Sequence, residues 1–191
     1  MLKRSIVLLL ATLAITSAAN AQKNDLGFGV GGYFAASNPL NLGAAWALEG
    51  SYARQFAGVP LLSVSAELPI AASYKSSVPT LNGTTLARSY TSLFVTPGVR
   101  VRLAPSFPIS PYVAAGLGYG RFNRELYNGN TSPYGAFAFD VAGGLDVKIL
   151  PFVSLRGEVR DFNSSTFGFQ SFIAPGRQNN IFVTLGLGVR F

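Results

Sequence analysis

The sequence predicts an all-β fold, an eight-stranded antiparallel up-and-down β-barrel, and three observations lead to this prediction. The 191 residues are 49% apolar and only 12% charged, and they include 21 glycines. Beyond the N-terminal region, no apolar run reaches the roughly 18–20 residues that a transmembrane helix requires. Apolar and polar residues instead alternate with a period of two in eight separate segments. This alternation is typical of β-strands with one apolar face.

The composition also excludes several kinds of site. Without cysteine the chain can form no disulfide, thiolate zinc site, thiol nucleophile or iron–sulfur cluster. Without histidine it lacks the commonest general base and the commonest metal ligand. Asp140 and Asp146 have no cluster of further candidate ligands around them in the sequence. We therefore expect no catalytic residue, no metal site and no bound cofactor.

Residues 1–21 have the features of a secretory signal peptide. Lys3 and Arg4 form a basic region, the apolar stretch Ser5–Thr16 follows it, and Ala19 and Ala21 occupy the small-residue positions of a cleavage motif. The apolar stretch is too short for a membrane anchor. We therefore expect cleavage after Ala21 and one barrel domain over residues 22–191.

The first four expected strands occupy the N-terminal half of this domain. Leu26–Phe34 alternates large apolar residues with glycine, and Ala45–Phe56 alternates Trp, Leu, Tyr and Phe with Glu, Ser and Gln. Leu61–Ile70 alternates aliphatic residues with Ser and Glu, and Ser89–Leu103 alternates Leu and Val with Thr and Arg. Pro97 lies within the fourth strand and removes a ladder donor, so we expect a β-bulge at Pro97-Gly98.

The last four expected strands repeat the pattern. Tyr112–Phe122 alternates Val, Ala, Leu and Tyr with Ala and Gly, and Phe137–Ile149 alternates Phe, Val, Leu and Ile with Asp and Lys. Val153–Phe162 alternates Val and Leu with Arg and Glu. Ile181–Phe191 alternates without exception and ends on an aromatic residue of the apolar face.

The connections between these strands alternate in length. The short ones are Ala57–Pro60, Ala104–Pro111 and Leu150–Phe152. The long ones are Ala35–Ala44, Ala71–Arg88, Asn123–Ala136 and Asn163–Asn179. Short turns at one end, long loops at the other and an even number of strands are the features of a transmembrane β-barrel.

The charged residues of the strands favour the same interpretation, because most lie on the polar faces. They are Glu49, Glu67, Arg100, Arg102, Asp140, Asp146, Lys148, Arg156, Glu158, Arg160 and Arg190. A narrow barrel in lipid would hold these side chains in its lumen and turn its apolar faces outward. Buried charges require partners. We expect Asp146 and Arg156 to face each other across the sixth and seventh strands, with Glu158 and Arg160 joining the same network.

Aromatic residues near the strand ends would form the girdles of such a barrel at the two membrane interfaces. Toward the long loops they are Phe34, Trp46, Tyr119, Phe137 and Phe139, and toward the short turns they are Phe152 and Phe191.

Three segments carry a resemblance to a known family. They are PYVAAGLGYGRF, DVAGGLDVKILPFVSLRGEVRDF and the C-terminal VTLGLGVRF. They resemble small OmpA-like outer-membrane β-barrels, including the opacity-type surface proteins and porin-family barrels, over essentially the whole mature chain. The resemblance implies a location in the outer membrane of a Gram-negative cell envelope. It also implies that Phe191 is the insertion signal recognised by the barrel-assembly machinery.

The expected partners follow from the same resemblance. They are outer-membrane lipids and lipopolysaccharide, and we expect a monomer. No residue follows Phe191, so we expect no peptidoglycan-binding domain of the kind found in full OmpA-type proteins. The arginines lie mainly within strands rather than in an exposed stripe, so we expect no nucleic acid as a partner.

Three functions remain open at this point. The first is a structural or surface-exposed outer-membrane barrel with a lumen plugged by charged pairs. The second is a small porin, and the third is a soluble periplasmic ligand-binding barrel with its apolar face inside. The barrel enzymes that the chain resembles in fold use histidine, which this chain lacks. Glu49 and Glu67 could form an acid–base pair, but lumen charges are the simpler explanation, and we expect no enzymatic activity.

Overall fold

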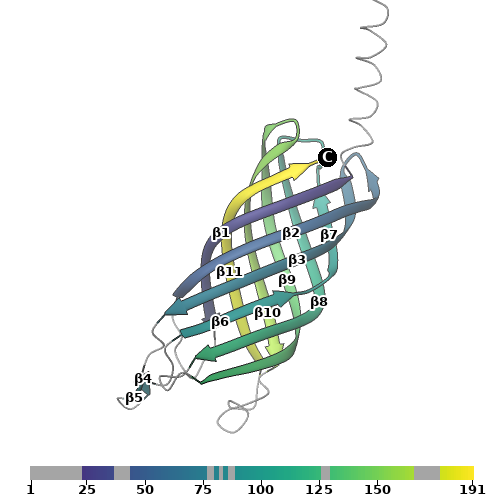
Figure 1. Ribbon diagram of the computed structural model, residues 1–191. Helices are drawn as coiled ribbons and strands as arrows, with labels where there is room; N and C mark the ends of the chain where they lie inside the picture. Colours follow the sequence, from purple (N-terminus) through teal and green to yellow (C-terminus); the bar gives the residue numbers. More distant parts are fainter. Residues whose placement is uncertain are drawn as a thin grey trace, which may run out of the picture.

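Eight long antiparallel strands close into a barrel in the computed structural model (Figure 1). The structure describes residues 23–36, 44–76, 80–81, 84–85, 89–125, 130–165 and 177–191. The expected cleavage positions Ala19 and Ala21 lie outside these residues. Among the described residues, no helix has the length and hydropathy of a membrane span.

The strands follow the sequence around the barrel. They are β1 (Asn24–Ala36), β2 (Ala44–Val59), β3 (Leu62–Ser76), β6 (Ser89–Val95), β7 (Gly98–Leu103), β8 (Ile109–Glu125), β9 (Thr131–Leu150), β10 (Val153–Ser165) and β11 (Arg177–Arg190). β6 and β7 are two parts of one barrel strand, since both lie between β3 and β8. The short hairpin of β4 (Thr80–Leu81) and β5 (Thr84–Thr85) follows β3 outside the barrel wall.

Pairing of the first strand with the last closes the barrel. Gly27 of β1 lies opposite Ser51 of β2 on one side and opposite Gly188 of β11 on the other. The hydrocarbon of a bilayer offers no hydrogen-bonding partner to backbone N–H and C=O groups, and the closed ladder pairs these groups within the protein. The eight-stranded antiparallel fold predicted from the sequence is therefore confirmed.

The two ends of the barrel differ. At the turn end, which lies at the top of Figure 1, residues 60–61, 104–108 and 151–152 make short connections beside Phe191. We call the opposite end, where β1 ends and β2 begins, the loop end. The strands extend farther toward the loop end than expected, because β3 runs to Ser76, β8 to Glu125 and β9 starts at Thr131.

The prediction of a bulge at Pro97-Gly98 is wrong. The strand Ser89–Leu103 is interrupted at Thr96 and Pro97, but its register against both neighbouring strands is the same before and after the break. The physical reason is that β3 skips two residues at the same place, one of them Pro69, so no residue is inserted. The Pro97 carbonyl still accepts a hydrogen bond of 3.1 Å from the Leu117 N–H.

The apolar faces of the strands point outward. Trp46 is 77% exposed, and aliphatic residues of every barrel strand are exposed in the same way. Examples are Val30, Leu48, Ile70, Leu93, Val113, Val141, Val159 and Leu185. The expected girdle residues are also exposed, except for the half-buried Phe139. A soluble ligand-binding barrel would need the opposite orientation, so the structure argues against that alternative.

Candidate functional site

The interior of the barrel is the candidate site, because the strands direct most of their charged residues into it. Two groups of ion pairs occupy the turn end and the middle of the lumen, and a cluster of aromatic rings occupies the loop end. Alternation explains this arrangement, since every second residue of a strand points to the same side of the wall.

The turn-end group is built around two aspartates. Asp25 accepts hydrogen bonds from Arg102 at 2.8 Å and from Arg156 at 2.7 Å. Asp146 accepts from the same two arginines at 2.7 and 2.8 Å, and from Arg190 at 2.9 Å. Each carboxylate is therefore shared by several guanidinium groups, which have the planar geometry that carboxylates bind best.

The central group is built around Arg160. Its guanidinium donates to Glu49 at 3.0 Å, to Glu158 at 2.6 Å and to Glu67 at 2.7 Å. It also donates to Asp140. Four buried carboxylates from four different strands thus converge on one buried cation.

Arg100 connects the two groups. It binds Glu67 with two hydrogen bonds, of 3.1 and 2.6 Å, and it reaches Asp25 at 3.4 Å. The Tyr112 ring lies 4.5 Å below the Arg100 guanidinium, and the Tyr112 hydroxyl donates to Glu158. Cation–π contact and hydrogen bonding therefore hold the centre of the network in one geometry.

The structure brings together most of the predicted lumen residues. Glu49, Glu67, Arg100, Arg102, Asp140, Asp146, Arg156, Glu158, Arg160 and Arg190 are all buried and form ion pairs. Lys148 is half-buried near the turn end and forms no ion pair with another described residue.

Sequence reasoning missed Asp25 and Tyr112. Asp25 precedes the expected start of the first strand, at Leu26, although its parity agrees with the lumen positions of that strand. Tyr112 shares its parity with the small residues Ala114 and Gly116, so the signal for a lumen position was present in the alternation.

Glycine makes room for the network on the wall formed by β1 and β11. A Cβ atom at Gly27 would lie 2.6 Å from the Ser51 hydroxyl and would also collide with the Arg156 guanidinium. A Cβ atom at Gly188 would lie 3.0 Å from Nη2 of Arg156, whereas the one at Gly27 would collide with Nη1. These two glycines therefore allow Arg156 to lie flat against the backbone.

Very little empty space remains within the network. A cavity of about 10 Å³ lies between β1, β2, β10 and β11, and it is lined by Glu49, Ser51, Arg156, Glu158 and Thr184 among others. This volume corresponds to roughly one water molecule. This cavity is far smaller than a solute such as a sugar or an amino acid.

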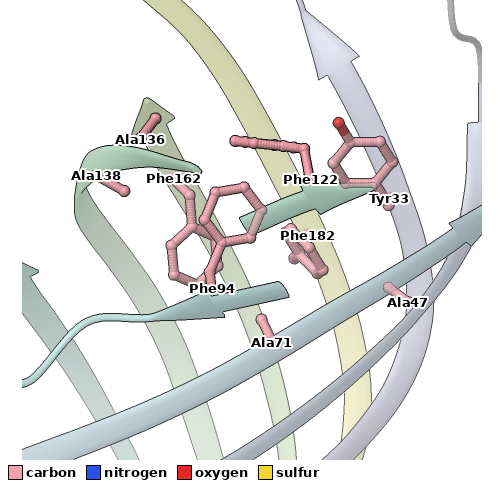
Figure 2. Packing of buried hydrophobic residues seen from close by; sticks show 9 residues of the cluster. All are labelled: Tyr33, Ala47, Ala71, Phe94, Phe122, Ala136, Ala138, Phe162 and Phe182. Atoms are coloured by element: carbon pink, nitrogen blue, oxygen red, sulfur yellow. The ribbon is translucent and has the colours of Figure 1, made fainter. Parts of the chain in front are cut away.

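An aromatic cluster fills the loop end of the lumen (Figure 2). Phe94 stacks on Phe162 with ring centroids 4.5 Å apart, and Phe182 meets both rings edge-on at 5.8 and 5.2 Å. Phe122 packs against Phe94 at 5.4 Å, and Tyr33 packs against Phe182 at 5.2 Å. The small side chains of Ala47 on β2, Ala71 on β3, and Ala136 and Ala138 on β9 surround these rings and leave room for them. Alternation alone does not predict that these rings meet, although the parity of each ring places it on the lumen side of its strand.

The chemistry available to this interior is limited. The buried carboxylates are held by arginine, and the described residues contain no group of acidic side chains that could hold a metal ion. Breaking a buried ion pair of this kind leaves an uncompensated buried charge, so the network resists rearrangement.

The sequence matches a family model described as the outer membrane protein beta-barrel domain, over residues 6–191. The chain belongs to this family. It follows that the protein is located in the cell outer membrane, as the resemblance implied. A comparison with curated proteins gives no significant match.

Solved structures similar to this chain are also small membrane barrels. Neisserial surface protein A (NspA) is 17% identical with a TM-score of 0.61, over 88% of this chain and 97% of that one. Ail, the attachment invasion locus protein of Yersinia pestis, is 11% identical with a TM-score of 0.55, over 88% and 96%. The outer membrane enzyme PagL is 11% identical with a TM-score of 0.52, over 87% and 99%. At such identities the similarity shows the fold alone.

Proposed function

We propose that the protein is a structural, surface-exposed barrel of the outer membrane whose lumen does not conduct solutes. The observation that carries this proposal is the double closure of the lumen. The ion-pair network fills the turn end and the middle, and the aromatic cluster fills the loop end. A porin would require both groups to move, and a mutually paired network resists such movement because each displaced charge loses its partners.

The orientation in the membrane is part of the proposal. The loop end faces the cell surface and the turn end faces the periplasm, as in other barrels with short turns on the periplasmic side. Phe191 lies exposed beside the end of β11, in agreement with its proposed role as an insertion signal for the barrel-assembly machinery. The protein acts as a monomer among outer-membrane lipids and lipopolysaccharide, with no nucleic acid as a partner.

The proposal includes no catalysis. PagL has a similar fold and is described as an outer membrane enzyme, so the barrel by itself does not decide this point. The chain has no histidine to serve as a general base. Glu49 and Glu67, the pair that could have done acid–base chemistry, both bind Arg160 instead.

Conductance in planar lipid bilayers tests the closed lumen. The folded protein, identified by its heat-modifiable migration on gels, is expected to leave the bilayer at its baseline current, while a porin reconstituted in parallel gives stable steps. A steady open pore of the wild-type protein would refute the proposal. A pore unchanged by Asp146→Asn would show in addition that the turn-end group does not line the conducting path.

A further inference from the structure

The outer wall of the barrel carries a groove of about 450 Å³ near the loop end. Its walls come from β2, β3, β6 and β8, and the residues that matter here are Trp46, Leu48, Ala72, Tyr74, Leu93 and Arg121. We call it the outer groove. Its volume lies within the ~300–1,000 Å³ range of ligand sites in proteins.

The strand register explains why a depression forms at this place. Leu48, Ala72, Leu93 and Arg121 follow one another across the four strands in one row of paired residues. Ala72 is the small member of this row, and the large side chains on either side of it rise above the wall. The adjacent row places Trp46 directly opposite Tyr74.

The outer groove combines an apolar surface with one cation. Trp46, Leu48, Tyr74 and Leu93 are all exposed on the outward face. Arg121 is also exposed and outward-facing, and it forms no ion pair with another described residue. A guanidinium on the lipid side of a barrel is unfavourable unless it lies near the interface or meets an anion. Trp and Tyr prefer the same interfacial depth.

We propose that the outer groove binds a lipid of the outer leaflet whose headgroup phosphate carries a net negative charge, without a cationic group beside it such as the choline of phosphatidylcholine. An acyl chain would lie along Leu48 and Leu93, and the headgroup phosphate would accept hydrogen bonds from Arg121. Guanidinium groups bind phosphate with two parallel hydrogen bonds, so Arg121 supplies the charge complementarity that a neutral wall would lack. The choice of leaflet rests on the proposed orientation of the loop end. The preference for an anionic phosphate over a zwitterionic headgroup does not depend on that orientation or on the conductance of the lumen.

Fluorescence of Trp46 can report lipid binding, because Trp46 is the only tryptophan of the chain and it lines the outer groove. The protein is reconstituted in phosphatidylcholine nanodiscs that contain a small fraction of spin-labelled phosphatidic acid or, in parallel, of spin-labelled phosphatidylcholine. Both leaflets then present the same lipids, so the result is independent of orientation. We expect phosphatidic acid to quench Trp46 fluorescence more strongly, with an apparent preference of about two- to fivefold for an exposed ion pair.

Two variants and one control decide the outcome. Arg121→Gln is expected to abolish the preference, and Arg121→Lys is expected to retain part of it. Arg54→Gln is the matched control, since Arg54 is an exposed arginine on the same strand as Trp46 but near the turn end. Equal quenching by both lipids in the wild-type protein would overturn the proposal, as would an equal loss of preference in Arg54→Gln and Arg121→Gln.

Discussion

Replacement of Arg160 by methionine is expected to destabilise the barrel strongly. Arg160 is buried and donates hydrogen bonds to four carboxylates. Among the described residues, Glu49 and Asp140 form ion pairs with no other cation, whereas Glu67 and Glu158 also meet Arg100. The substitution therefore leaves two buried carboxylates without an ion pair.

The size of the effect follows from the cost of such groups. Removal of one partner from a buried ion pair costs about 3–5 kcal/mol, because the remaining charge is buried without compensation. With a urea slope of ~2 kcal/mol/M, a loss of ~4 kcal/mol shifts the unfolding midpoint by about 2 M. The assay is reversible urea unfolding in phosphatidylcholine vesicles, followed by Trp46 fluorescence and by heat-modifiable migration.

Two further variants make this test specific to charge. Adding Asp140→Asn to Arg160→Met removes the charge of one of the two carboxylates that have lost their ion pair. The double variant is expected to recover ~1–3 kcal/mol of the free energy of unfolding. Arg54→Met changes an exposed arginine that forms no ion pair with a described residue, and it is expected to stay within ~0.5 kcal/mol of the wild type. A loss below ~1 kcal/mol for Arg160→Met, or no recovery in the double variant, would refute the claim that ion pairing holds the lumen together.

Three other predictions concern packing and orientation. Gly27→Ala is expected to cost ~1–3 kcal/mol, because its Cβ would collide with side chains of the lumen, whereas Gly143→Ala meets no atom within 4 Å and serves as the neutral control in the same urea assay. Phe162→Ala is expected to cost ~3–5 kcal/mol and to loosen the loop end, and an unchanged urea midpoint would contradict this. A spin label at Leu185, which is 59% exposed, should collide with oxygen dissolved in the lipid, whereas one at the buried Thr184 should not. The reverse result would mean that the polar face of the strand contacts lipid, which would contradict the structure.

The sequence predicts the two faces of the wall well, because they depend only on local alternation. Once Leu185 is assigned to the outward face, alternation places Thr184 in the lumen. Arg190 has the same parity as Thr184 and therefore also lies in the lumen. The pairing of Asp146 with Arg156 was also accessible, since a short connection places them opposite each other in β9 and β10.

The rest of the site depends on contacts between different strands, which the alternation within one strand does not predict. Arg160 reaches Glu49 and Glu67 only because the sheet curves into a closed tube and brings distant strands within a side-chain length. The break at Thr96 and Pro97 depends on the neighbouring strand, where Leu68 and Pro69 lack a partner in β6 and β7 at the same place. Neither feature can be derived from one strand considered by itself.

The pairing of Asp25 with Arg190 has a consequence for how the barrel assembles. These residues are 165 positions apart in the chain, and Arg156 meets Asp25 across 131 positions. Such non-local contacts form slowly, because a long loop must close before they stabilise anything. An open sheet in the bilayer would expose Asp25 to hydrocarbon before its partners on β10 and β11 arrived. We therefore expect insertion and closure to occur as one cooperative step, with half-closed sheets held near the membrane surface until the C-terminal strand joins the first.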